Sequence, residues 1–238
     1  AGNLFQVNQA FSQFAEVFYG GADAMGEKER SIVEMIFGFA LAVLVGLVVV
    51  FGIKGIGKVT SLLVPVMCGI YVLGCIVVLL CNVGELPAAL QTIWREAFKP
   101  EAGVGAILIA ILMGFRRAAF SNEAGFGSAS IAHSAVKTNY PASEGLVALL
   151  EPFVDTIIVC SMTALVIVVT GVWDSDSGLG GIELTSQAFE TVIPWFPVIL
   201  SIAAIVFAIS TIITWCYYGE QASAYLFGGN AVIGYLYR

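Results

Sequence analysis

The chain has 238 residues, of which 59% are apolar and 11% are charged, and its mean hydropathy is +0.93. Because soluble domains carry about 25% charged residues, this composition excludes a soluble globular domain, and it also excludes a disordered chain. The net charge of −7 argues against a basic surface that would bind nucleic acid or anionic lipid headgroups. A membrane protein remains, and its expected partners include the lipid bilayer but no nucleic acid.

Four long apolar windows are predicted to be membrane-spanning helices. A span needs about 18–20 apolar residues with almost no charge, because unpaired charges and backbone groups are costly in hydrocarbon. The sequence begins within an amphipathic element, so residues 3–19 are expected to be the end of a helix and the sequence a piece of a longer chain. The four spans then follow at about residues 33–53, 59–82, 145–171 and 198–219. The sequence therefore predicts an all-α polytopic membrane protein.

Residues 102–137 are predicted to form a fifth crossing that is broken in the middle. The segment is apolar up to Phe115, continues through Arg116 and Arg117 into a polar, glycine-rich patch, and becomes apolar again near Ala129. A break at membrane depth frees backbone groups that lipid cannot satisfy, so such a segment must face protein or a water-filled cavity. The two arginines cannot be placed from the sequence.

Loop charges predict the orientation of these crossings. Lys54 and Lys58 lie in the loop after the first span and Lys137 follows the broken segment, so both regions are placed on the cytoplasmic side. The alternate loops contain more acids than bases, and these are residues 20–32, 85–101 and 174–183. If all three acidic loops face outward, the broken segment must cross the membrane once.

The patch at residues 120–128 is the first candidate binding site. Discontinuous transporter helices bind substrate at such points, because helix ends offer N–H groups to a carboxylate and free carbonyls to a cation. Glycine lets a small ligand contact the backbone, and the neighbouring side chains supply hydrogen bonds. The candidate residues are Ser121, Asn122, Glu123, Gly125 and Gly127. The alternative is a polar surface loop in which Glu123 is a structural anchor.

The last span contains the second candidate site. Ser210, Thr211 and Thr214 lie within two helical turns and precede Trp215. Adjacent hydroxyls can donate oxygen ligands to a small hard cation, but they can equally bond to the carbonyls of their own helix. Trp215 either closes an apolar substrate pocket or anchors the helix at the membrane interface.

Glu151 and Asp155 lie four residues apart on one face of a helix. They either relay protons or clamp a neighbouring helix, and the clamp is favoured. The basic partners considered for this clamp are Lys137, Arg116 and Arg117. His133 is expected to be a hydrogen-bonded packing residue. The five cysteines lie in apolar runs and are also expected to be packing residues.

Catalytic and nucleotide-binding motifs are absent from the sequence, including HExxH, GxSxG, GxxxxGK[ST] and GxGxxG. The protein is therefore not expected to be an enzyme, and no cofactor is expected.

The string GFRRAAFSNEAGFGSASIAHSAVKT, residues 114–138, resembles the signature of the alanine/glycine:cation symporter family of sodium-coupled amino-acid carriers. The resemblance continues through GIKGIGKVTSLLVPVM from Gly52, EGLVALLEPFVDTIIVCSMTALVIVVTG from Glu144 and FAISTIITWCYYGE from Phe207. It therefore covers nearly the whole chain.

The resemblance implies a leucine-transporter type of fold, with two inverted five-helix repeats and an unwound first and sixth helix. On that scheme the chain is a fragment that runs from the end of the third core helix to the start of the ninth, and the broken segment is the sixth helix. The first core helix, which in the family lines half of the substrate and sodium sites, is not part of this sequence.

The resemblance also implies roles for individual residues. Asn122, Gly125 and Gly127 would face the substrate along the unwound helix, and Trp215 would close the pocket. Ser210 and Thr211 match the positions of hydroxyl ligands for a sodium ion, and Gln6 and Asn8 would lie near the same cavity.

The expected function is sodium-coupled symport of a small neutral amino acid, alanine or glycine, into the cell across the cell membrane. Sodium is then the coupling ion and the amino acid is the substrate. The alternatives are a proton-coupled amino-acid carrier, an ion channel and a membrane scaffold that transports nothing.

Overall fold

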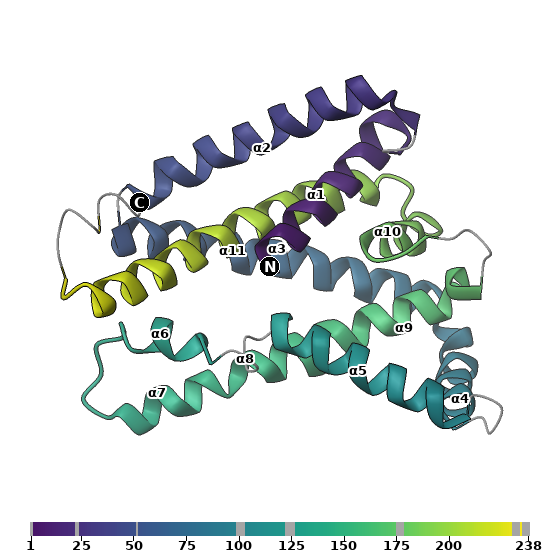
Figure 1. The fold of residues 1–238 in the computed structure, drawn as a ribbon. Helices are drawn as coiled ribbons and strands as arrows, with labels where there is room; N and C mark the ends of the chain where they lie inside the picture. Colours follow the sequence, from purple (N-terminus) through teal and green to yellow (C-terminus); the bar gives the residue numbers. More distant parts are fainter. Residues whose placement is uncertain are drawn as a thin grey trace. The chain divides into compact units, whose positions relative to one another are not determined.

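The computed structural model describes residues 2–21, 24–50, 52–98, 103–121, 127–174, 179–229 and 234 (Figure 1). Within these ranges the chain forms helices joined by turns, and the ranges contain no β-strand. In chain order the α-helices are α1 (Gly2–Tyr19), α2 (Glu27–Val49), α3 (Gly52–Cys81), α4 (Leu86–Ala97), α5 (Gly103–Ser121), α6 (Ala129–His133), α7 (Pro141–Ala148), α8 (Leu150–Pro152), α9 (Ser161–Val169), α10 (Ile182–Glu190) and α11 (Phe196–Leu226). Short 3₁₀ turns occupy Val83–Glu85 and Val172–Asp174, and Phe153–Cys160 is π-helical.

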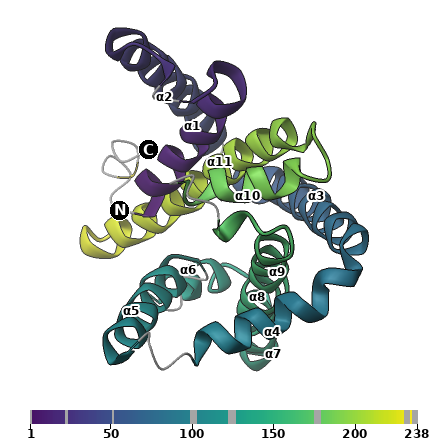
Figure 2. The ribbon, with the colours of Figure 1, turned by 90° about the vertical axis from the view of Figure 1, so that its right-hand side faces the viewer.

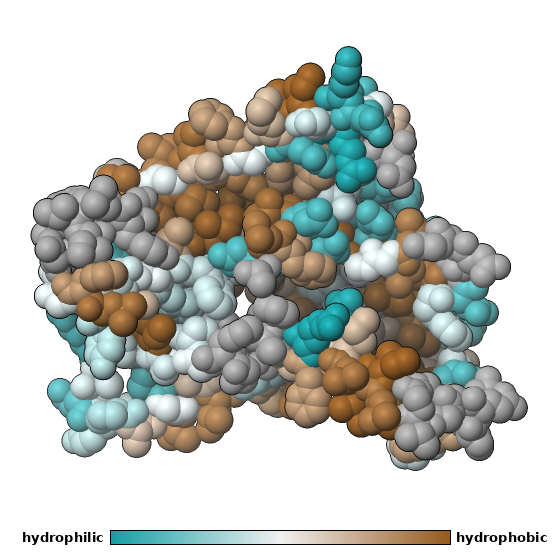
Figure 3. Space-filling view, viewed as in Figure 1, coloured by the Kyte–Doolittle hydropathy of each residue, from teal (hydrophilic) through white to brown (hydrophobic). Residues whose placement is uncertain are grey.

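Four helical stretches are long and apolar enough to cross a membrane, namely Glu27–Val49, Gly57–Cys81, Pro141–Val169 and Phe196–Leu226. Between 11% and 33% of the residues in their apolar windows are buried, so most of the apolar surface of these four stretches is exposed in this chain. The visible surface over α2 is hydrophobic along most of the helix and hydrophilic near its first turn (Figure 3). The prediction of an all-α polytopic membrane protein is confirmed, while the exact limits of the membrane crossings stay predictions.

The helices form two compact units. Unit 1 contains Ala1–Gly74 and Ser175–Arg238, and unit 2 contains Cys75–Asp174. Helix α3 contributes residues to both.

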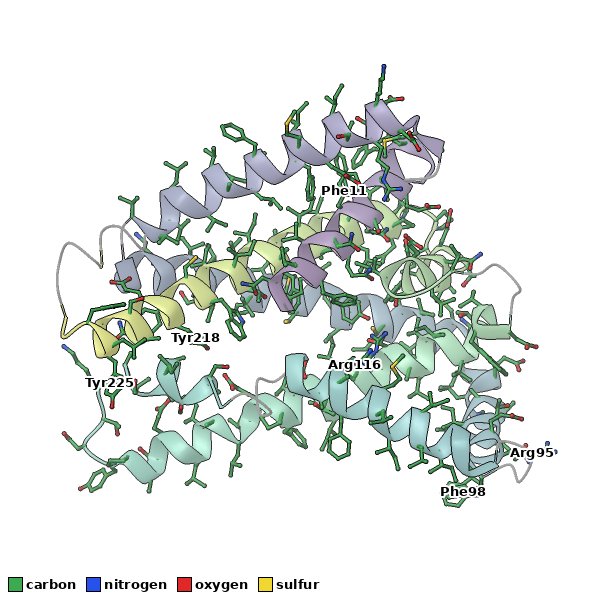
Figure 4. The ribbon with its side chains drawn as sticks, viewed as in Figure 1. Phe11, Arg95, Phe98, Arg116, Tyr218 and Tyr225 are labelled. Atoms are coloured by element: carbon green, nitrogen blue, oxygen red, sulfur yellow. The ribbon has the colours of Figure 1, made fainter. Side chains whose placement is uncertain are left out.

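Unit 1 is built around α11, which packs against α1 and α2 (Figures 1 and 2). Phe11 points from α1 toward α2 (Figure 4), and its ring lies 5.5 Å from the ring of Phe37 in an edge-to-face arrangement. Further along α2, Val45 and Val49 pack against the fully buried Ile213 of α11. These apolar contacts hold α1, α2 and α11 together.

Helix α10 is held in unit 1 by aromatic packing around a glycine. Phe189 of α10 stacks on Phe196 at the start of α11, with ring centroids 4.3 Å apart, and Tyr71 of α3 meets Phe189 edge-on at 5.6 Å. A Cβ atom at Gly74 would lie 2.5 Å from Phe196 Cζ, which is well inside van der Waals contact. Glycine at position 74 therefore allows α3 to approach α10 and α11 closely.

In unit 2, α4 runs across α9 (Figure 2). Residues from Pro141 to Val169 form a nearly continuous helical stretch that contains α7, α8, the π-helical segment and α9. Pro152 has no amide hydrogen and cannot make a regular helical bond, and the π-helical segment begins at the next residue. Changes of helical pitch of this kind often mark functional positions.

Part of the interruption predicted within residues 102–137 falls on residues 122–126, which lie outside the described residues. Helix α5 ends at Ser121, Gly127 and Ser128 form a turn, and α6 begins at Ala129. Arg116, which projects from α5 in Figure 4, and the adjacent Arg117 have exposed side chains. The membrane crossing of this segment stays a prediction.

Candidate substrate and cation site

The proposed cation ligands lie on α11 and bond to their own helix. Ser210 Oγ donates to the Phe207 carbonyl at 2.9 Å, and Thr211 Oγ1 donates to the same carbonyl at 3.0 Å. Thr214 Oγ1 donates to the Ser210 carbonyl at 2.9 Å. These are the hydrogen bonds to carbonyls of the same helix that were considered as the alternative to cation binding. Each hydroxyl donates its single proton in this bond and keeps its oxygen lone pairs. Cation binding at these hydroxyls therefore stays a prediction.

Trp215 follows these hydroxyls on the same helix. Its ring is half-buried and meets the Tyr218 ring edge-on, with centroids 5.7 Å apart. Tyr218 is 7% exposed and extends from α11 (Figure 4). This contact fixes one side of the Trp215 indole. It is compatible with both roles considered for Trp215, which are closing a pocket and anchoring the helix at the membrane interface.

The two polar residues proposed to line the cavity from α1 differ in environment. Gln6 is half-buried, and its Oε1 atom is buried without a hydrogen-bond partner. Asn8 is exposed in unit 1. Asn3, three residues before Gln6, also has a buried side-chain oxygen without a partner. Gln6 and Asn3 therefore present neutral oxygens that accept no hydrogen bond within the described residues.

Gln13 is a buried polar residue that the sequence analysis missed. Its side chain is fully buried, and Nε2 donates to Ser186 Oγ of α10 at 2.8 Å and to the Pro197 carbonyl of α11 at 3.3 Å. Both amide hydrogens are therefore used, whereas Oε1 is buried without a partner in the part of the chain that the structure describes. Ser201, one turn after Pro197, is 1% exposed, and its Oγ also lacks a partner among the residues described.

Gln9, one turn before Gln13, contacts the first turn of α10. Its Oε1 atom accepts the backbone N–H of Ile182 at 3.1 Å. A Cβ at Gly181 would collide with the Gln9 side chain, and Gly181 has φ of +61°, so glycine is required there. The signal for these contacts was present in the sequence, because Asn3, Gln6, Gln9 and Gln13 recur every three or four residues and share one helix face.

Unit 2 contains the other part of the predicted substrate site. Gly127 has φ of +68°, a conformation that other residues rarely adopt. Ser130 Oγ donates to the Gly127 carbonyl at 2.8 Å, which ties the turn to the first residues of α6. Asn122, Glu123 and Gly125 lie outside the described residues, and Ser121 is the last residue of α5.

His133, at the end of α6, contacts two glutamates of unit 2. Nδ1 lies 2.6 Å from Glu144 Oε1 of α7, and Nε2 lies 3.6 Å from Glu151 Oε1 of α8. The prediction of a hydrogen-bonded histidine is confirmed. Among the described residues, the neighbouring helix residue that Glu151 contacts is His133, not one of the basic residues considered, because the chain turn after α6 brings α7 back alongside it.

Comparison with known proteins gives a consistent result. The chain matches the family described as "Sodium:alanine symporter family" over residues 1–238. It is 39% identical over 234 residues to the sodium/alanine symporter AgcS of Methanococcus maripaludis, covering 97% of this chain and 49% of that protein. The putative sodium/proton-dependent alanine carrier protein YrbD of Bacillus subtilis is 32% identical over 207 residues, covering 81% of this chain and 43% of the relative. The probable sodium/glutamine symporter GlnT of the same organism is 32% identical over 203 residues, covering 84% and 42%. The chain thus spans about half, or less, of the length of these relatives.

Proposed function

The chain belongs to the sodium:alanine symporter family, and on that premise we propose that the protein is a secondary active transporter that imports a small neutral amino acid together with sodium across the cell membrane. The substrate we favour is alanine or glycine, because the most extensively matched relative described above is named a sodium/alanine symporter. The related names also include a glutamine symporter and a sodium/proton-dependent carrier.

The observation that carries this proposal is the interruption between α5 and α6, with Gly127 at positive φ. An amino acid is a zwitterion, so its site must satisfy one carboxylate and one ammonium group. The N–H groups at the start of a half-helix favour the carboxylate, and backbone carbonyls freed by a break favour a cation. We assign substrate binding to Asn122, Gly125 and Gly127, with Trp215 closing the pocket.

The cation is proposed to bind at Ser210 and Thr211. Sodium is a hard cation that prefers oxygen ligands, and these two hydroxyls converge on one carbonyl, that of Phe207. A cation would use their free lone pairs without breaking either bond. Ser121, Glu123, Gln6 and Asn8 are assigned to the wider cavity.

Sodium can supply the work for accumulation. One charge that moves down a potential of 100 mV releases about 2.3 kcal/mol, which corresponds to roughly fiftyfold accumulation of the substrate. Coupling requires that sodium and amino acid each raise the affinity for the other, and this effect is reciprocal.

The test is uptake of labelled alanine by the full-length protein in liposomes. We expect saturable uptake with an inward sodium gradient and none when potassium replaces sodium on both sides. Uptake that ignores sodium but follows a proton gradient would contradict the ion assignment, and no uptake of alanine or glycine would contradict the substrate. Flux that does not saturate would indicate a channel.

Gly127 provides a site-specific test with a matched control. Substitution Gly127→Ala forces a left-handed backbone conformation on alanine, so we expect at least about a tenfold loss of uptake. Gly114→Ala on α5 has nothing within 4 Å of its new Cβ and no positive φ, so uptake should be retained. Equal uptake by both variants would contradict a role for the turn, and loss of folded protein in Gly127→Ala alone would indicate a structural role.

A further inference from the structure

His133 lies between two carboxylates in a partly enclosed setting. The side chains of His133 and Glu144 are 19% and 16% exposed, whereas that of Glu151 is 54% exposed. His133 ends α6, whereas Glu144 in α7 and Glu151 in α8 lie on the nearly continuous helical stretch that follows. The cluster therefore joins the short helix after the break to the two helices that follow.

The distances determine how many protons the cluster needs. At 2.6 Å, Nδ1 and Glu144 Oε1 must share a proton. In a neutral imidazole the other nitrogen then has a lone pair, and this lone pair would face the Glu151 carboxylate 3.6 Å away. Nε2 is buried and has no hydrogen-bond partner among the described residues. The lone pair and the Glu151 carboxylate repel each other. A second proton on the ring makes the imidazole positively charged, and the ring and the carboxylate then attract each other.

The surrounding charges favour that second proton. Glu144 from α7 and Glu151 from α8 are the groups whose oxygens contact the imidazole. Asp155 lies one turn after Glu151 and adds a further acid, while Lys137 lies in the exposed turn between α6 and α7. Two carboxylates in direct contact with one imidazole leave a negative charge that a bound proton reduces.

We propose that His133, Glu144 and Glu151 form a proton-binding site that fastens α6 to α7 and α8 when it is occupied. Protonation allows both ring nitrogens to donate, one to each carboxylate. Loss of the proton leaves the Glu144 contact and releases Glu151, so α6 is held less firmly. Histidine changes its charge between roughly pH 5 and 8, so the site responds over that range. Its consequence for transport rests on the proposed function, but proton binding itself does not.

Hydrogen–deuterium exchange of the full-length protein in lipid nanodiscs tests the site without requiring transport. Peptides that cover residues 127–148 are compared between wild type and His133→Gln at the same pH, so that the intrinsic pH dependence of exchange cancels. We expect these peptides to exchange about threefold more slowly in the wild type at pH 6 and at nearly equal rates at pH 8. Equal rates at both pH values would overturn the proposal.

Two further variants keep the test decisive if His133→Gln does not fold. Glu151→Gln removes the carboxylate that the doubly protonated imidazole would contact. It should therefore reduce the protection of residues 127–148 from exchange at pH 6 relative to wild type. Glu85→Gln removes the same charge from an exposed position between α3 and α4 and should leave the protection unchanged. An equal effect of both substitutions would show a general charge effect and contradict the site.

Uptake measurements then separate this inference from the proposed function. At a fixed sodium gradient, the ratio of alanine uptake at pH 8 to uptake at pH 6 should be above one in the wild type and move toward one in His133→Gln. An unchanged ratio in the variant would contradict the effect on transport. Absence of uptake in the wild type would contradict the proposed function, and the exchange experiment would still decide whether the proton site exists.

Discussion

Substitution of Gly74 by alanine tests the packing that holds α10 in unit 1. The new Cβ would lie 2.5 Å from Phe196 Cζ, 2.7 Å from Phe196 Cε2 and 3.3 Å from Phe189 Cε1. Carbon atoms pack at about 3.5–4.0 Å, so the ring of Phe196 must retreat by at least about 1 Å. Phe196 is 3% exposed and stacks on the fully buried Phe189, so it has little room to move. We expect Gly74→Ala to destabilise the folded protein by about 1–3 kcal/mol, as overpacking of a core does.

Thermal unfolding of the full-length protein in detergent measures this effect. Gly69→Ala is the matched control, because Gly69 lies in the same helix and its Cβ would have nothing within 4 Å. That variant should be as stable as wild type or gain up to about 1 kcal/mol from helix propensity. The double variant Gly74→Ala with Phe196→Leu should recover part of the loss, since the smaller side chain leaves room for the new methyl group. If Gly74→Ala and Gly69→Ala unfolded at the same temperature, the close approach of α3 to Phe196 would be refuted.

Two other predictions concern α11 and α1. Replacing both Ser210 and Thr211 by alanine should raise the sodium concentration for half-maximal uptake about tenfold, equivalent to about 1.4 kcal/mol. Ser223→Ala removes the same kind of bond to the helix backbone and should leave that sodium concentration unchanged. An equal effect of Ser223→Ala would exclude a sodium role for Ser210 and Thr211. Gln13→Met removes two hydrogen bonds to α10 and α11 and leaves buried partners unsatisfied, so thermal unfolding should show a loss of about 1–3 kcal/mol. The exposed Asn8→Met should show no such loss, and equal stability of the two variants would contradict the Gln13 contacts.

Much of the fold could be predicted from the sequence, because membrane helices are encoded locally. A helix that crosses a bilayer needs one uninterrupted apolar run, and the windows near 33–53 and 198–219 could be read from composition alone. Gly125 and Gly127, amid polar residues, predicted a break within residues 102–137, and Gly127 lies in the turn before α6. The hydroxyls of Ser210 and Thr211 also follow local rules, since their bonds reach back only three or four residues.

The sequence by itself thus determined the class of protein and its long apolar helices, because each depends on residues that are neighbours along the chain. Helix α4, in contrast, lies within residues 85–101, which were expected to form a loop. Only the tertiary structure decided which polar groups meet. Gln13 and Ser186 are 173 residues apart in sequence and 2.8 Å apart in space, and no spacing pattern pairs them. The partner of Glu151 proved to be His133, which depends on how the chain turns after α6. Such contacts follow from the packing of whole helices, and packing depends on shape complementarity that a periodic pattern does not describe.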